Sequence, residues 1–368
     1  MGEGLKSAKQ GLANLKNLKV LDLSGNEIYG SLSSLGLANL TNLKVLNLGG
    51  NQINNSLSSL GLKMLRNLEE LDLSDNGMGG SLTLLGLANL TNLKVLYLYG
   101  NQINNSLSSL GLANLTNLKS LDLSGNQINT SLSSLGLKYL KNLEQLNMRD
   151  NGMSGSLTSL GLANLINLKS LDLSDNQINT SLASLGLQNL KNLEELYMVE
   201  NGMSGSLTSL GLVNLTNLKR LDLSYNQIAN ARDFKSLENL EELYMGGNAM
   251  GGDSLTLGSA NLTNLKILDL YNNQINNSLT SLGETDSKGF TTKLSWEVGS
   301  HEPDAYHYDS YITMEDRYSE VANAEVIFKV EFTMKNRFES YKGYPLGKVA
   351  GLDLSDNELT GSEEAISG

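Results

Sequence analysis

Asparagine recurs at a fixed interval along most of this 368-residue chain. Nine asparagines from Asn26 to Asn226 stand 25 residues apart, and each closes a stretch of the pattern L-x-x-L-x-L-x-x-N, with methionine in place of the third leucine at Met148 and Met198. The step shortens to 22 at Asn248, returns to 25 at Asn273, and is then interrupted for 84 residues before Asn357. A chain with this period folds as a stack of similar units, each of which contacts only its neighbours.

The leucine spacing in each unit predicts a short strand. In the first copy the alternation places Leu21 and Leu23 on one face and Val20, Asp22 and Ser24 on the other. We expect the leucines to face inward and the variable residues to face solvent. One coil alone cannot bury its leucines, so neighbouring coils must stack to do so.

The repeated asparagine has a structural role at the end of the strand. Backbone groups there lose their ladder partners, and a buried carboxamide can both donate to them and accept from them. We predict a ladder formed by Asn26, Asn51, Asn76, Asn101, Asn126, Asn151, Asn176, Asn201, Asn226, Asn248, Asn273 and Asn357.

A period of 25 residues lies within the range of about 20 to 29 that is typical of leucine-rich repeats. We therefore predict an α/β solenoid, a right-handed leucine-rich-repeat superhelix with a parallel β-sheet on its concave face and a mostly irregular or 3-10 convex side. One island insertion interrupts it. The expected organisation is eleven repeats over residues 1–283, an island over 284–347, and a final partial repeat with a tail over 348–368. Twelve strands spaced about 4.8 Å apart would span roughly 50 Å.

Composition restricts the partners of such a solenoid. A net charge of −12 disfavours nucleic acid and anionic membrane surfaces, which both need a basic footprint. The chain has no apolar run of about 18 residues and no signal-peptide core at its start, so we expect no direct membrane insertion by it. With no cysteine, the compartment cannot be read from disulfides.

The sequence offers no support for catalysis or for a cofactor. It has no P-loop, no G-x-G-x-x-G after a strand and no G-x-S-x-G elbow, so we expect no enzyme. The repeated aspartates stand in single file, without the converging oxygens of a calcium site. His301 and His307 lie among acidic residues but lack zinc spacing, and we interpret that loop as solvated.

Ten N-x-S/T acceptors occur in two phases relative to the asparagine ladder. Either they are N-glycosylated in an extracellular setting, or duplication copied two chance matches in a repeat rich in asparagine and serine. The first phase comprises Asn39, Asn89, Asn114, Asn214 and Asn261, and the second comprises Asn54, Asn104, Asn129, Asn179 and Asn276.

The interruption differs in composition from the repeats. It holds the only tryptophan, both histidines, both prolines and four of the five phenylalanines. Residues 326–335 alternate between apolar and polar side chains, which predicts a strand with one apolar face. A long insertion in a compact repeat array favours a functional role.

The island and its junction with the last repeat resemble a known family. The junction runs KVEFTMKNRF at residues 329–338, YKG at 341–343 and GLDLSDNELTG at 351–361, and NQINNSLSSL at 51–60 is similar to the plant repeat N-x-L-x-G-x-I-P-x-x-L. These motifs resemble plant receptor-like proteins, the cell-surface receptors that lack a kinase domain. The paired-cysteine caps, repeat prolines and transmembrane helix of that family are absent from this sequence.

The resemblance implies a receptor ectodomain on the outer side of the plasma membrane. Such an ectodomain binds a peptide or protein ligand in immunity or development and signals through a receptor-kinase adaptor and a co-receptor kinase. The alternative is a non-signalling binding module, either a secreted inhibitor, a gene fragment or an engineered consensus scaffold. The near-identical stretches at 50–62 and 100–112 favour recent duplication or consensus construction.

Candidate recognition residues lie at the exposed strand positions. Tyrosine supplies an apolar ring and a hydrogen-bonding hydroxyl, and tyrosine is enriched at binding hot spots. The alternative is a tyrosine patch that packs only against itself. The concave-face candidates are Tyr97, Tyr99, Arg149, Tyr197, Glu200, Arg220, Tyr225, Tyr244 and Tyr271, and the island and co-receptor candidates are Trp296, Tyr306, Tyr308, Tyr311 and Lys342.

Charges at the first exposed strand position alternate strictly from Lys119 onward. Neighbouring strands would therefore place opposite charges side by side. Because solvated ion pairs contribute only about 0 to 1 kcal/mol each, we interpret them as register and solubility devices.

Overall fold

The computed structural model describes residues 14–28, 36–53, 61–79, 86–104, 111–129, 136–154, 161–179, 186–206, 212–230 and 237–250, and then residues 264, 267–269, 273 and 351–353. The chain divides into two compact units, residues 1–176 with 338–368 and residues 177–337. The predicted island and its strand lie outside the described residues, and so do Tyr271, Trp296, Tyr306, Tyr308, Tyr311, Lys342, His301 and His307.

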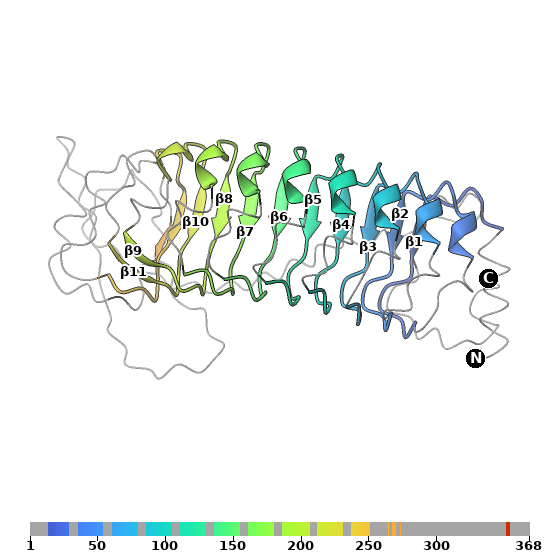
Figure 1. The fold of residues 1–368 in the computed structure, drawn as a ribbon, viewed down its shortest axis with the longest axis horizontal. Helices are drawn as coiled ribbons and strands as arrows, with labels where there is room; N and C mark the ends of the chain where they lie inside the picture. The colour runs from blue at the N-terminus through green and yellow to red at the C-terminus, as the bar shows by residue number, and fades with distance from the viewer. Residues whose placement is uncertain are drawn as a thin grey trace, which may run out of the picture. The chain divides into compact units, whose positions relative to one another are not determined.

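The first unit is a leucine-rich-repeat coil with one short parallel strand in each repeat (Figure 1). Equivalent residues of adjacent repeats pair throughout, so that Leu21 lies opposite Leu46 and Leu46 opposite Leu71. The strands are β1 (Val20–Asp22), β2 (Val45–Asn47), β3 (Glu70–Asp72), β4 (Val95–Tyr97), β5 (Ser120–Asp122), β6 (Gln145–Asn147) and β7 (Ser170–Asp172).

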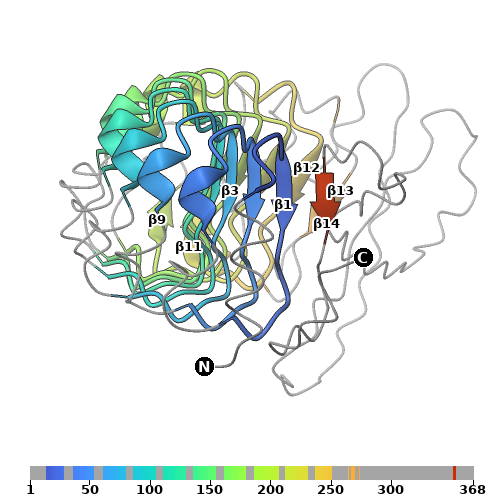
Figure 2. The same cartoon turned by 90° about the vertical axis from the view of Figure 1, so that its right-hand side faces the viewer.

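The last leucine-rich segment occupies an unexpected place in this unit. Strand β14 (Gly351–Asp353) pairs in parallel with β1, with Leu352 opposite Leu21 and Asp353 opposite Asp22 (Figure 2). The segment predicted as a final partial repeat thus supplies a strand beside the first repeat, and its bounds of 348–368 stay a prediction. Its G-L-D-L-S sequence has the same alternation as β1, so it fits the open first edge of the sheet as well as it fits the other end.

The second unit continues the same strand pattern despite a shorter repeat. Asp222 lies opposite Tyr197 on one side and Tyr244 on the other, although the asparagine step after Asn226 is only 22 residues. Its sheet contains β8 (Glu195–Tyr197), β10 (Arg220–Asp222), β12 (Glu242–Tyr244) and β13 (Ile267–Asp269). A separate two-stranded parallel sheet contains β9 (Ser204–Ser206) and β11 (Gln227–Asn230).

Opposite the strands, the coils turn through short 3-10 helices, as the repeat predicts. A glycine with positive φ precedes each 3-10 helix of the first unit; at Gly111 φ is 70°, and an added Cβ would lie 2.6 Å from the Cβ of Ala88. The 3-10 helices are η2 (Leu37–Asn39), η4 (Leu62–Met64), η6 (Leu87–Asn89), η8 (Leu112–Asn114), η10 (Leu137–Tyr139), η12 (Leu162–Asn164), η14 (Leu187–Asn189) and η16 (Leu212–Asn214).

Leucines from the strands and the 3-10 helices form a dry interior. Leu96, Leu98 and Leu90 have no exposed surface, and the same positions are buried in the other described repeats. Each such side chain contributes roughly 1.5 to 3 kcal/mol relative to an exposed one. The leucine pattern of the sequence thus predicted the core, and the leucine-rich-repeat solenoid is confirmed.

The periodic asparagines lie at the end of each strand with their carboxamides pointing inward. Nδ2 of Asn76 donates to the carbonyl oxygens of Leu48 at 3.0 Å and Ser74 at 2.8 Å, while its Oδ1 accepts from the N–H of Ile53 at 2.9 Å. The carboxamide therefore joins its own coil to the preceding coil through both its donor and its acceptor. The described members are buried except Asn151 and Asn273, which are half-buried, and Asn357 lies outside the described residues.

Candidate binding face

We call the side of the strands opposite the leucine core the sheet face. It carries the outward side chains, such as Val20 and Asp22 in β1 and their equivalents in the other strands. Of the nine candidate positions on this face, eight are described and Tyr271 is not. Glu200, Arg149 and Tyr225 are exposed, and Tyr97, Tyr99, Tyr197, Arg220 and Tyr244 are half-buried.

Aspartates at the middle strand position are used by the fold itself. The Oδ1 of Asp72 accepts from the N–H of Ser74 at 2.8 Å and from its hydroxyl at 2.5 Å, and Asp72 is only 3% exposed. Burial raises the pKa of Asp72, while the two bonds from Ser74 lower it, and burial also raises the pKa of Asp172. The prediction that these positions face solvent is therefore wrong for Asp72 and Ser74, which are both buried.

Ion pairs run between neighbouring strands along one edge of the face. Glu69 lies between Lys44 and Lys94, with 2.6 Å from a carboxylate oxygen to each Nζ. The hydrogen bonds from these two lysines hold the pKa of Glu69 at about 2. Lys119, Glu144 and Lys169 repeat the arrangement in the first unit, and Lys219 pairs with Glu194 at 2.7 Å in the second. The predicted side-by-side placement of opposite charges is confirmed for these pairs.

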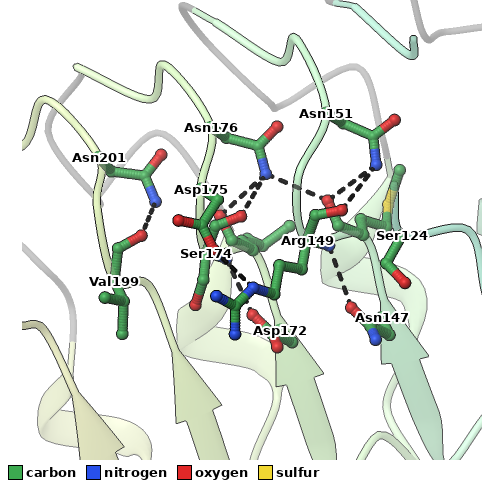
Figure 3. A network of polar contacts seen from close by, with 12 residues as sticks. Ser124, Asn147, Arg149, Asn151, Asp172, Ser174, Asp175, Asn176, Val199 and Asn201 are labelled. Atoms are coloured by element: carbon green, nitrogen blue, oxygen red, sulfur yellow. Dashed lines mark hydrogen bonds and ion pairs between the residues drawn. The ribbon is translucent and has the colours of Figure 1, made fainter. Parts of the chain in front are cut away.

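Arg149 extends over the next repeat of the first unit (Figure 3). Its Nε lies 2.5 Å from Oδ2 of Asp175, and its backbone N–H donates to Oδ1 of Asn147 at 3.0 Å. Asp175 has a φ of 53°, at a turn position that glycine occupies in several other repeats. The ion pair holds a candidate arginine at the end of the strands rather than above their middle.

The second unit gathers four side chains from three strands. Nη1 of Arg220 donates to the hydroxyl of Tyr197 at 3.2 Å, and its Nη2 forms an ion pair with Glu242. The hydroxyl of Tyr244 donates to the same Glu242 oxygen at 3.0 Å. Burial opposes the charge of Arg220, but the bonds to Glu242 and Tyr197 outweigh burial and raise the pKa of the guanidinium. Burial raises the pKa of the Tyr197 hydroxyl.

Sequence reasoning placed three of these residues correctly on one face and missed the fourth. Tyr197, Arg220 and Tyr244 come together as expected, whereas Glu242 connects them and was not a candidate. The repeat register could have indicated Glu242, because the E-L-Y triplets at 195–197 and 242–244 both pair with β10 so that Arg220 lies between Glu195 and Glu242. Tyr225 does not join this group, because it lies in the turn after β10 with a φ of 54°.

A second row of asparagines, just before the strands, also has a structural role that was not predicted from the sequence. Each Nδ2 donates to a carbonyl of the preceding repeat, as Asn117 does to Thr91 at 2.8 Å, but these side chains are exposed. The recurrence of N-L-K or N-L-E directly before the strands β1 to β8, β10, β12 and β13 was the available signal. The described members include Asn42, Asn67, Asn92, Asn117, Asn142, Asn167, Asn217, Asn239 and Asn264.

The sequons among the described residues lie away from the sheet face. Asn39, Asn89, Asn114 and Asn214 are exposed third residues of 3-10 helices, and Asn104, Asn129 and Asn179 are exposed on the segment that follows the ladder. Asn54, Asn261 and Asn276 lie outside the described residues. N-glycosylation at these sites remains a prediction.

Two further features are absent from the described residues. Among these residues, no three or more His, Cys, Asp or Glu side chains are grouped closely enough to hold a metal ion. No helix in the same part of the chain has the length and apolar character that crossing a membrane requires.

Comparison with known proteins agrees with this geometry. Residues 16–63, 91–139 and 216–251 match the family model "Leucine Rich repeats (2 copies)", and residues 65–81 and 164–181 match "Leucine Rich repeat". No curated protein matches the sequence.

Solved structures with a similar fold come from bacteria and plants. An internalin (inlF) from Listeria monocytogenes is 28% identical with a TM-score of 0.52, over 77% of this chain and 92% of that one. The ectodomain of the Arabidopsis receptor kinase HAESA, in complex with an IDA peptide hormone, is 25% identical with a TM-score of 0.51, over 72% of this chain. This chain spans 47% of the HAESA chain. The chain therefore has the fold of a leucine-rich-repeat solenoid, built on the repeat that the family models describe.

Proposed function

We propose that this chain binds a peptide or protein along its sheet face. The observation that carries the proposal is the group of Tyr197, Arg220, Glu242 and Tyr244, which come from three strands and interlock through their polar ends. Tyrosine and arginine, together with tryptophan, are enriched among the residues that dominate binding energy at interfaces. Leucine-rich repeats provide the long regular surface on which such residues are displayed.

The polar bonds within the group favour binding because they reduce the side-chain entropy that is lost when a partner binds. A free arginine or tyrosine loses roughly 0.5 to 1.5 kcal/mol of side-chain entropy when a partner immobilises it. Here Arg220 is already held by Tyr197 and Glu242, and Tyr244 by Glu242. The group is therefore ordered before a partner arrives, whereas the tyrosine rings keep part of their surface open to solvent.

The more specific proposal is the ectodomain of a plant receptor-like protein at the cell surface. Support comes from the island-to-repeat junction at 329–361 and from the likeness to HAESA, a receptor kinase ectodomain solved with a peptide hormone. In this proposal the partners are a peptide or protein ligand, a receptor-kinase adaptor and a co-receptor kinase. The co-receptor contact falls on the island, at Trp296, Tyr306, Tyr308, Tyr311 and Lys342.

A non-signalling binding module is the second candidate. The likeness to internalin InlF supports it, because this likeness covers 92% of a bacterial chain and shows that the fold is not confined to plant receptors. Both candidates use the sheet face, and they differ in whether a kinase partner binds the island. Surface plasmon resonance with a co-receptor ectodomain distinguishes them: deletion of residues 284–347 abolishes binding in the receptor case.

The general proposal is tested without knowledge of the natural ligand. Random nonamer peptides are displayed and selected in parallel on the full chain and on the Y197A/Y244A chain, with the folding of both chains checked by circular dichroism. We expect families of peptides that enrich on the wild-type chain and not on the variant. If no family enriches, or if the same families enrich on both chains, the sheet face at β8, β10 and β12 is not the binding site.

A further inference from the structure

The strand register of the second unit creates a specific arrangement in the middle row of the sheet face. Asp222 of β10 lies opposite Tyr197 of β8 on one side and opposite Tyr244 of β12 on the other. Adjacent strands are about 4.8 Å apart, so the side chains on one face of three such strands are close neighbours. An aspartate thus stands between two tyrosines in the strand register, and all three residues are half-buried.

The charges around this triplet are unbalanced. In β8, β10 and β12 we count the residue before each strand and the first and third residues of the strand. These positions carry five carboxylates and two cations. Both cations are engaged within the protein, since Lys219 pairs with Glu194 and Arg220 pairs with Glu242. The five carboxylates are Glu194, Glu195, Asp222, Glu241 and Glu242. This part of the face is therefore net negative and complements a positively charged partner.

The polar ends of the two tyrosines are fixed by the neighbouring row. The Tyr197 hydroxyl accepts from Arg220, and the Tyr244 hydroxyl donates to Glu242. Asp222 is fixed as well, because its Oδ1 accepts from the N–H of Ser224 at 3.0 Å. Aromatic rings on both sides of a carboxylate suit an ammonium or guanidinium group, which gains from the negative ring faces and from the opposite charge.

We infer that the Tyr197–Asp222–Tyr244 triplet receives an arginine or lysine side chain of the bound peptide. This inference rests on the proposed function and specifies the partner as a basic peptide. The first unit supplies a contrast at the same row. There Asp122 lies opposite Tyr97 and Asn147, so only one tyrosine stands beside it, and its Oδ2 accepts from Nδ2 of Asn147 at 3.1 Å.

The test uses nonamer peptides selected on the wild-type chain and resynthesised with single replacements. Replacement of one arginine by citrulline, or of one lysine by norleucine, is expected to weaken binding by about tenfold, which is typical of a desolvated cation–π contact. D222N is expected to weaken the same peptides to a similar extent, and D122N is expected to leave their Kd unchanged. The peptide replacements keep the test valid even if D222N alters folding.

The outcomes separate this inference from the proposed function. Selected peptides that depend on Tyr197 and Tyr244 but tolerate neutral replacement at every cationic position would overturn the inference and leave the sheet-face proposal standing. Equal effects of D222N and D122N would also overturn it. If no peptide is selected at all, both statements fail together.

Discussion

Arg220 donates to the hydroxyl of Tyr197 across adjacent strands, with 3.2 Å between Nη1 and the phenol oxygen. Because Arg220 also pairs with Glu242, it connects a tyrosine of β8 with a glutamate of β12. The bond depends on the repeat register, which places residue 220 beside 195 and residue 222 beside 197. A period kept by buried leucines and asparagines therefore decides which surface residues meet.

The buried asparagine ladder should carry much more stability than the exposed one. Asn126 donates to the carbonyls of Leu98 and Leu123, both at 3.0 Å, and its Oδ1 accepts from the N–H of Ile103 at 2.9 Å. N126A leaves these buried groups without partners and should lower the free energy of unfolding by about 2 to 4 kcal/mol. Urea denaturation measures the loss.

The control lies in the same repeat. Asn117 makes one exposed bond, to the carbonyl of Thr91, so N117A should cost about 1 kcal/mol or less. If the two variants lose equal stability, the buried ladder does not hold the coils together.

Acid should remove the contribution that the lysine-flanked glutamates make to folding stability. The pKa of Glu69 is lowered from 4.5 to about 2 by Lys44 and Lys94, so its contribution is present above pH 4.5 and is lost as the pH falls toward 2. E69Q should be less stable than wild type at pH 7, and the difference should fade between pH 4.5 and 2. Thermal unfolding at a series of pH values measures it.

The contribution of Asp72 to stability should change with pH in the opposite direction. Burial raises its pKa from 3.8, so its contribution is present below pH 3.8 and is lost as the pH rises through the raised value. The stability of D72N relative to wild type should therefore rise with pH. Parallel pH profiles for E69Q and D72N would contradict this account of the two carboxylates.

Glycine before a 3-10 helix should not be replaceable. Gly111 has a φ of 70°, and a Cβ there would lie 2.6 Å from the Cβ of Ala88, so G111A should cost roughly 1 to 3 kcal/mol. G77A is the matched control, because nothing lies within 4 Å of an added Cβ at Gly77. Thermal midpoints that fall by the same amount in both variants would show that the glycine conformation is not required.

The place of the last leucine-rich segment can be tested because the chain has no cysteine. Val20 of β1 lies opposite Gly351 of β14, so V20C/G351C should form an intramolecular disulfide on mild oxidation. Non-reducing peptide mapping identifies the bridge. A disulfide in I267C/G351C, with none in V20C/G351C, would instead support a final repeat stacked after β13.

Much of the fold could be predicted from the sequence, because leucine and asparagine recur with the period of the coil. The strand position of Leu21 and the turn position of Asn26 follow directly from that period. The order of β14 could not be predicted, since its leucine pattern fits either end of the sheet. Neither could the burial of Asp72, because Asp22 and Asp122 accept the same bond from the serine two residues on and are only half-buried.

The candidate site was predicted less completely than the fold. The repeat spacing identified Tyr197 and Tyr244 as neighbours of β10. The polar contacts that connect them through Arg220 and Glu242 could be found only from the side-chain geometry. Glu242 takes part because it accepts from both Arg220 and Tyr244, and a sequence pattern does not show which of several adjacent glutamates does so.

Photo-crosslinking tests most directly whether the sheet face is the binding surface. A selected nonamer that carries a benzophenone side chain is bound to the full chain, irradiated, and the attachment points are mapped by mass spectrometry. We expect attachment within residues 194–200, 219–225 and 241–247, around β8, β10 and β12. Attachment at the 3-10 side instead, for example within residues 112–117 or 137–142, would contradict it.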